Sequence, residues 1–235
     1  YPKDHPLSSG TIDVKYMTAK EEDILTSSNL IEKGLVIDKL LESVIANPKV
    51  KLDDLLIGDK NALMLGTRVL GYGKEYVVEI EDPDTTLKVE FNIDLTSLEA
   101  KKIDEKVYKN GENKFSYELP NSKRTLEFKL LTHKDEQEVD NAIKQYSKIE
   151  KVTGVSNALT TRLKKQILSV DGETNIKKIS DFVDNEFLAL DTKAFRKYST
   201  SITPDIIFET EYESQIGELH TVTIPIGVGF FWPED

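Results

Sequence analysis

The stretch from Tyr16 to Ala46, YMTAKEEDILTSSNLIEKGLVIDKLLESVIA, decides how this chain begins to fold. Thr18 and Glu21 have the spacing of a capping box, in which the Thr oxygen and the Glu carboxylate bind backbone N–H groups at a helix start. Gly34 separates this helix from a second one, which ends before Pro48. The apolar residues of the second helix recur at steps of three and four: Ile37, Leu40, Leu41, Val44 and Ile45. They form one stripe, so the sequence predicts amphipathic helices that need a partner surface.

The composition is that of a folded, acidic protein. The 235 residues are 38% hydrophobic and 31% charged, which suits one large domain or two small ones around a core. The net charge of −11 disfavours binding to nucleic acid or to an anionic membrane, because both require Lys and Arg, and we expect neither partner. Arg162, Lys164 and Lys165 could form a local basic patch, but a solvated helix face is the simpler interpretation.

Cysteine is absent, which excludes disulfides and cysteine-ligated zinc. We also expect neither a signal peptide nor a membrane span.

The apolar pattern predicts an α+β fold, with helical N-terminal and central blocks and antiparallel β hairpins that could pair into one small sheet. Five regions follow from it: an extended N-terminal arm at 1–15, a helical region at 16–73, a β hairpin region at 74–132, a second helical region at 133–202, and a C-terminal β hairpin with an aromatic tail at 203–235. We expect residues 16–235 to form one compact unit. The segments VEIEDPDTTLKVEFNI and IFETEYESQIGELHTVTIPI resemble each other, which indicates either a duplication or two hairpins that pair in one sheet.

Individual elements follow from alternation for strands and from steps of three and four for helices. Residues 76–93 alternate on both sides of Asp82-Pro83-Asp84, which predicts a hairpin with one buried face. Asn110-Gly111 is typical of a tight turn, and Asp191 is expected to cap a short helix. The further predicted strands are 107–108, 115–119 and 125–131, and the further predicted helices are 139–149, 155–168 and 176–187.

No arrangement typical of catalysis or of metal binding occurs in the sequence. His5, His133 and His220 are the only histidines, and they do not form an H-E-x-x-H motif. We interpret His133 as a helix-boundary residue and His220 as a hydrogen-bonded or solvent-facing strand residue. P-loop, dinucleotide-binding and nucleophile-elbow motifs are absent, and the carboxylate pairs are what 42 acidic residues produce by chance. We therefore predict a protein that is not an enzyme, with no catalytic, cofactor-binding or metal-binding residues and no cofactor.

Six separated stretches resemble one known family, and they occur in the same order as in that family. They are YMTAKEEDILTSSNLIEKGLVIDKLL at 16–41, DDLLIGDKNALMLGTRVLGYGKEY at 53–76, TGVSNALTTRLKKQILSVDGE at 153–173, FVDNEFLALDTKAFRKY at 182–198, TPDI at 203–206 and IPIGVGFFWP at 224–233. Together they are similar to a T-even-type bacteriophage baseplate protein family that is associated with the hub of contractile tails. Residues 100–131 carry no part of this resemblance.

The resemblance implies a non-enzymatic role in a contractile-tail bacteriophage. It leaves open whether the chain is a structural component that docks between hub and wedge subunits, or a chaperone for the hub that is absent from the mature virion. A tail-associated peptidoglycan-active enzyme is a further alternative. The implied partners are other baseplate and tail-tube or hub proteins in a symmetric hetero-oligomeric assembly. The implied location is the tail baseplate of the virion, which is assembled in the bacterial host cytoplasm.

The resemblance also raises the question of a zinc site. Some members of the family carry C-x-x-C at the tips of two hairpins, a motif that ligates zinc. The matching tips here are Asp82-Pro83-Asp84-Thr85 and Tyr212-Glu213-Ser214-Gln215, and neither contains a thiol. We therefore expect the hairpins to be held by β pairing and packing alone.

The two ends of the sequence are the candidates for docking on a partner. Large apolar side chains occur there next to irregular backbone, a combination that favours contact with another surface. The candidate interface residues are Leu7, Ile12 and Tyr16 in the arm, and Phe230, Phe231 and Trp232 in the tail. The alternative for the tail is that it folds back into the core of its own chain.

Overall fold

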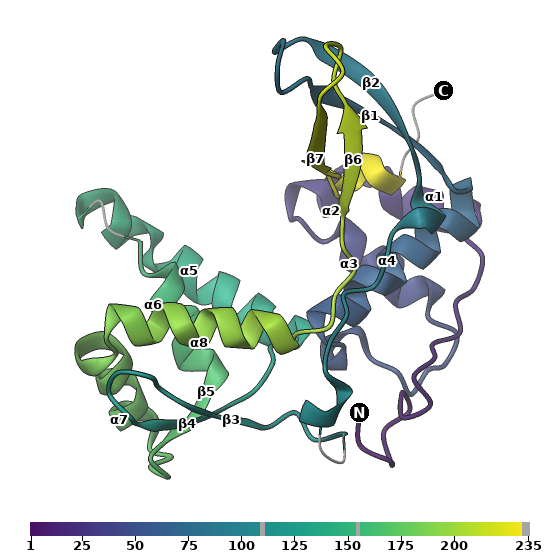
Figure 1. Cartoon of the computed structure of the whole chain (residues 1–235). Helices are drawn as coiled ribbons and strands as arrows, with labels where there is room; N and C mark the ends of the chain where they lie inside the picture. The colour runs from purple at the N-terminus through teal and green to yellow at the C-terminus, as the bar shows by residue number, and fades with distance from the viewer. Residues whose placement is uncertain (109–110, 154–155, 232–235) are drawn as a thin grey trace. The chain divides into compact units, whose positions relative to one another are not determined.

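A computed structural model describes residues 1–108, 111–153 and 156–231, with side chains except at 147–153 and 228 (Figure 1). Contacts within the chain divide it into two compact units. Unit 1 comprises Tyr1–Thr11, Asp53–Ile57 and Lys102–Thr203, and unit 2 comprises Ile12–Leu52, Gly58–Lys101 and Pro204–Asp235. Each unit is built from three segments, so residues that are far apart in the sequence become neighbours within it.

The single helix predicted between Thr18 and Gly34 is two short helices, whereas the next helix lies between Gly34 and Pro48 as predicted. The helices of unit 2 are α1 (Ala19–Leu25), α2 (Ser28–Glu32), α3 (Val36–Val44) and α4 (Ile57–Tyr72, in unit 2 from Gly58), with a 3-10 helix η2 (Leu95–Ser97). The capping box of α1 is confirmed, because the Thr18 N–H donates to Glu21 Oε2 at 2.9 Å. Gly34 follows α2 with a φ of +66°, a conformation that favours glycine. Leu40 and Leu41 of α3 are fully buried, so the predicted stripe faces the core.

The strands of unit 2 form two separate hairpins. β1 (Glu75–Glu81) pairs with β2 (Lys88–Asp94), and β6 (Glu209–Glu213) pairs with β7 (Leu219–Thr223), both antiparallel. Val78, Ile93 and Tyr212 are buried while their strand neighbours face outward, which confirms one buried face per hairpin. In the part of the chain that is described, the two hairpins do not share a sheet; the Phe91 and Tyr212 rings pack edge to face at 5.4 Å instead. A 3-10 helix, η6 (Val228–Phe231), follows the second hairpin.

Unit 1 packs helices against a three-stranded antiparallel sheet of order β3–β4–β5. The strands are β3 (Phe115–Glu118), β4 (Thr125–Phe128) and β5 (Ile167–Val170). The α-helices are α5 (His133–Thr153), α6 (Ala158–Gln166), α7 (Ile176–Asp181) and α8 (Ala189–Ile202). Unit 1 also contains the 3-10 helices η1 (Leu52–Asp54, shared between the units) and η3 (Glu105–Val107) and a π-helix, η5 (Phe182–Glu186). Phe128 of β4 and Phe195 of α8 are both fully buried, with ring centroids 4.9 Å apart. The observed helices and small antiparallel sheets confirm the α+β class.

Three expectations for unit 1 are wrong in detail. The helix predicted at 155–168 ends at Gln166, and Ile167–Val170 is a strand, because this short apolar run pairs with β4 and is mostly buried. Periodicity alone does not assign runs of this length. Val107 belongs to a 3-10 helix that Asp104 caps, not to a strand. Asp191 lies within α8 rather than at its cap.

Two further points concern the limits of individual elements. The predicted turn at Asn110-Gly111 involves Asn110, which lies outside the described residues. His133 is the first residue of α5, as predicted, and its N–H donates to Leu55 O at 2.8 Å. Among the helices that the structure describes, none has both the length and the apolar character needed to cross a membrane.

Candidate docking sites

The six predicted interface residues differ in how accessible they are. Leu7 lies in unit 1 and is buried, whereas Ile12 is partly exposed and Tyr16 is 71% exposed in unit 2. Phe230 and Phe231 are buried in unit 2, where Phe230 packs edge to face on Tyr76 at 5.1 Å. Trp232 lies outside the described residues. Among the predicted residues that the structure describes, Tyr16 is the most exposed. Phe230 and Phe231 occupy the core of unit 2, which is the alternative given for the tail.

The N-terminal residues form successive turns. Backbone hydrogen bonds run from His5 to Pro2, from Ser8 to His5 and from Gly10 to Leu7, each at 2.9 Å. Val14 then forms an isolated antiparallel bridge with Ile45 of unit 2.

The tips of the two unit 2 hairpins are joined by one buried carboxylate, that of Asp82. Its Oδ2 accepts from the Tyr212 hydroxyl at 2.8 Å and from the Gln215 N–H at 3.0 Å, while Oδ1 accepts from the Thr85 N–H at 2.8 Å. Burial by itself raises the pKa of Asp82, but these hydrogen bonds to the ionised form outweigh it and lower the pKa overall. Hydrogen bonds between the tips therefore add to the packing that the sequence predicted.

The tips do not fit a thiolate zinc site, but they do gather three other metal-ligating side chains. Asp82, Thr85, Tyr212 and Gln215, at the ends of the two tip segments, all take part in the hydrogen bonds just described. Beside them, Asp84, Glu218 and His220 each offer a ligand atom within 4.8 Å of the others. His220 Nε2 lies 2.9 Å from Asp84 Oδ2, so a hydrogen bond accounts for this contact. His220 is thus a hydrogen-bonded strand residue, as predicted.

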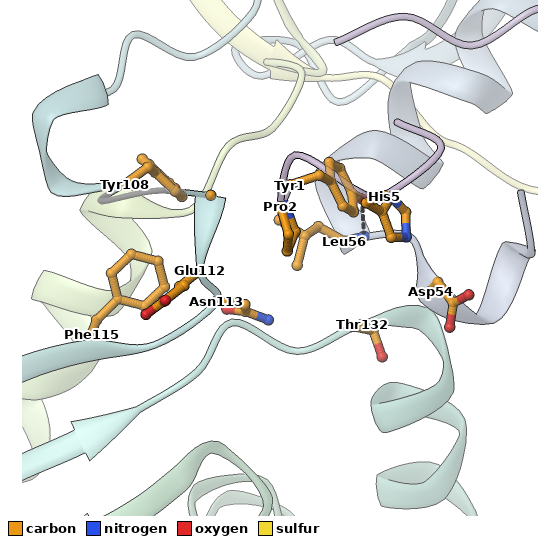
Figure 2. Close-up of a pocket in the computed structure, with 11 residues that line it drawn as sticks. Tyr1, Pro2, His5, Asp54, Leu56, Tyr108, Glu112, Asn113, Phe115 and Thr132 are labelled. Atoms are coloured by element: carbon orange, nitrogen blue, oxygen red, sulfur yellow. Dashed lines mark hydrogen bonds between the residues drawn. The ribbon is translucent and has the colours of Figure 1, made fainter. Parts of the chain in front are cut away.

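Unit 1 contains a cavity of about 360 Å³ that four separate segments line (Figure 2). The N-terminal turns contribute Tyr1, Pro2 and His5, and the segment around η1 contributes Asp54 and Leu56. The chain leading into β3 contributes Tyr108, Gly111, Glu112, Asn113 and Phe115, and Thr132 comes from the position just before α5. Its volume is within the range of ligand pockets. No local sequence pattern predicts this site, because only the fold brings its four segments together.

The predicted basic face of α6 is neutralised by ion pairs. Arg162 pairs with Glu136, Lys164 with Asp184 at 2.6 Å, and Lys165 with Glu138 at 2.5 Å. Contacts of this kind are typical of a solvated helix face.

The fold and these sites can now be set beside known proteins. A family model described as T4 bacteriophage base plate protein matches residues 2–232 of the chain. The chain belongs to this family. Searches of curated proteins and of solved structures returned no match.

The family match covers nearly the whole sequence and includes both units. The resemblance seen in the six stretches is therefore confirmed, and the chain is a bacteriophage baseplate protein. This membership implies contact with other bacteriophage baseplate or tail proteins.

Proposed function

We propose that this baseplate protein is a non-enzymatic structural component of a contractile-tail baseplate and that it docks between hub and wedge subunits. The observation that carries the proposal is a group of exposed apolar side chains at the hairpin tips of unit 2. Leu87, Ile216 and Leu219 are 56%, 65% and 69% exposed; we call them the tip surface. Exposed apolar groups that lie near one another favour a protein interface.

The hydrogen bonds of the Asp82 carboxylate support this assignment, because they join the two hairpin tips that carry the tip surface. Leu87 adjoins the turn that Asp82 closes, and its carbonyl accepts from the Asp82 N–H at 2.8 Å. Ile216 follows Gln215, whose N–H binds the same Asp82 carboxylate. Figure 1 shows the ends of the β1–β2 and β6–β7 hairpins on the same side of unit 2. A rigid tip loses less conformational entropy on binding than two free hairpins would.

Acidic side chains along β6, which leads to the tip, would select the partner. Glu209, Glu211 and Glu213 alternate along β6 and are exposed on one face of the strand. Burial of the tip surface would supply affinity, and these carboxylates would favour a neighbour with basic residues at the rim of the contact. Tyr16 and Trp232 remain proposed contacts on the arm and the tail.

The test is incorporation of tip variants into baseplates. In a phage that lacks the gene, the double variant Ile216→Asp/Leu219→Asp, supplied in trans, should enter purified tails at least roughly tenfold less than wild type, because charge would be buried in an apolar contact. Ile176→Asp is the matched control, since Ile176 is 83% exposed but lies in unit 1. Normal incorporation of the double variant would refute the tip surface as a docking site. Tyr16→Asp and Trp232→Ala test the arm and the tail separately.

The same preparation separates the structural component from an assembly chaperone. Quantitative mass spectrometry of mature virions should find a structural component at a fixed ratio to other baseplate proteins. A chaperone would be required for hub assembly and missing from the virion. A zymogram on peptidoglycan should show no clearing, and a clear band would overturn the non-enzymatic assignment.

A further inference from the structure

The unit 1 cavity has aromatic walls on two sides. Tyr1 and His5 stack with ring centroids 4.6 Å apart, and Tyr108 and Phe115 pack edge to face at 5.3 Å. In Figure 2 the Tyr1 side and the Tyr108 side flank an open space. Leu56 adds aliphatic surface to the lining. Such walls suit the apolar stem of an inserted side chain.

Most polar groups in the lining already have partners within unit 1. The Tyr1 hydroxyl accepts from the Leu56 N–H at 3.0 Å. Both ends of the Asn113 amide bind the backbone of Leu130 at 2.8 Å. His5 Nδ1 accepts from the Leu7 N–H at 3.2 Å. These groups hold the walls in place and do not call for a ligand.

Two carboxylates of the lining differ from the rest. Asp54 and Glu112 are exposed, and among the residues that the structure describes neither forms an ion pair. A second cleft in unit 1 is a useful contrast, because its Arg124 pairs with Asp171 at 2.8 Å and with Glu186 at 2.5 Å. The aromatic cavity thus combines apolar walls with negative charge that has no partner, whereas the Arg124 cleft is internally neutralised.

We propose that this cavity receives a lysine or arginine side chain from a neighbouring baseplate subunit. A long basic side chain has the two properties that the cavity matches: an aliphatic stem that packs on apolar surface, and a cationic head that carboxylates bind. Aromatic rings stabilise the cation further through their π faces. An acidic ligand would be repelled by Asp54 and Glu112. The choice of a baseplate subunit as donor rests on the proposed function, but the binding chemistry of the cavity does not.

The experiment uses the full chain and small probes of defined chemistry. N-acetyl-arginine methylamide and N-acetyl-lysine methylamide are titrated while backbone amide shifts are followed by NMR. We expect saturable shifts at Leu56, Gly111 and Phe115. The neutral analogues N-acetyl-citrulline methylamide and N-acetyl-norleucine methylamide should bind several-fold more weakly, because they lack the charge.

Variants assign the charge recognition to the two carboxylates. Asp54→Asn and Glu112→Gln should each weaken arginine binding roughly two- to fivefold, the range of an exposed ion pair. Glu105→Gln is the matched control, since Glu105 is exposed on η3 but is not in the lining. All three positions are exposed, so the fold is preserved.

The proposal is overturned if the citrulline probe binds as well as the arginine probe, if the Asp54→Asn/Glu112→Gln double variant binds the arginine probe like wild type, or if no probe shifts the lining amides. None of these results affects the incorporation test of the tip surface, which is in unit 2. Loss of incorporation by the tip variant together with an inert cavity would therefore retain the proposed function and discard the basic-side-chain pocket.

Discussion

Substituting Gly58 by alanine tests the backbone contact that anchors the second hairpin of unit 2. A Cβ at Gly58 would lie 1.9 Å from Pro204 O, 2.5 Å from Pro204 C and 2.9 Å from Asp205 Cα. Because Cβ atoms do not approach other atoms closer than 3.0 Å, the two backbones would have to separate by about 1 Å. That movement would also stretch the hydrogen bond from Asn61 Nδ2 to Asp205 Oδ1, which is 2.8 Å long.

The backbone shift and the stretched hydrogen bond together set the expected loss of stability. Overpacking that shifts backbone costs about 1–3 kcal/mol, and a hydrogen bond to a charged group contributes about 1.5–3 kcal/mol. We expect Gly58→Ala to lower the free energy of unfolding by about 3 kcal/mol or more. Gly66→Ala is the matched control in the same helix, because a Cβ there meets nothing within 4 Å. Alanine in an open helix interior should stabilise by about 0.5–1 kcal/mol.

Urea unfolding followed by circular dichroism measures both variants. Their free energies of unfolding should differ by about 4 kcal/mol, which moves the midpoint on the order of 1–2 M urea. If Gly58→Ala unfolds at the same urea concentration as Gly66→Ala, α4 does not touch the Pro204 backbone and the reasoning fails.

Two further predictions concern carboxylates. Burial alone raises the pKa of Asp191, but hydrogen bonds from Asn121 and Ser122 lower it to about 2. The ionised Asp191 carboxylate therefore stabilises the folded state above pH 3.8, its ordinary pKa, and this stabilisation is lost as the pH falls from 3.8 through about 2. The loss of stability between pH 5 and pH 3, measured by urea unfolding, should be smaller in Asp191→Asn; equal pH slopes for both proteins would contradict this. At the hairpin tips, Tyr212→Phe should lower the midpoint of thermal unfolding, because Asp82 loses a hydrogen-bond donor. A chelator should leave the wild-type midpoint unchanged, and elemental analysis should find no stoichiometric zinc. A midpoint that drops on chelation would show that a metal supports the tips.

Local signals in the sequence were sufficient for most elements but not for their long-range contacts. The capping box at Thr18 and the alternation around Asp82 depend only on near neighbours, and both predictions are confirmed. β5 was predicted as helix because Ile167 and Leu168 continue the stripe of α6, and only pairing with β4 decides in favour of a strand. Tertiary contacts override local preference in such short segments.

The candidate sites were harder to predict than the elements, for the same physical reason. Asp82 is recognisable as a turn residue, since Asp at the first turn position binds following N–H groups. Its second role depends on Tyr212, which is 130 positions away. The cavity likewise needs Tyr1, Leu56 and Tyr108 to meet, and none of the three carries a local signal.

Two of the stretches that carry the family resemblance meet in unit 2. Gly58 and Asn61 belong to the stretch at 53–76, and Pro204 and Asp205 belong to TPDI at 203–206; these two family-like stretches are in direct contact in unit 2. The resemblance there follows from packing, because a side chain larger than glycine does not fit at position 58. Tyr108, Glu112 and Phe115 lie in 100–131, where none of the six stretches falls. Asp54 and Leu56 of the same cavity lie within the stretch at 53–76, so its lining draws on segments inside and outside the six stretches, whereas the contact between α4 and Pro204 joins two of them.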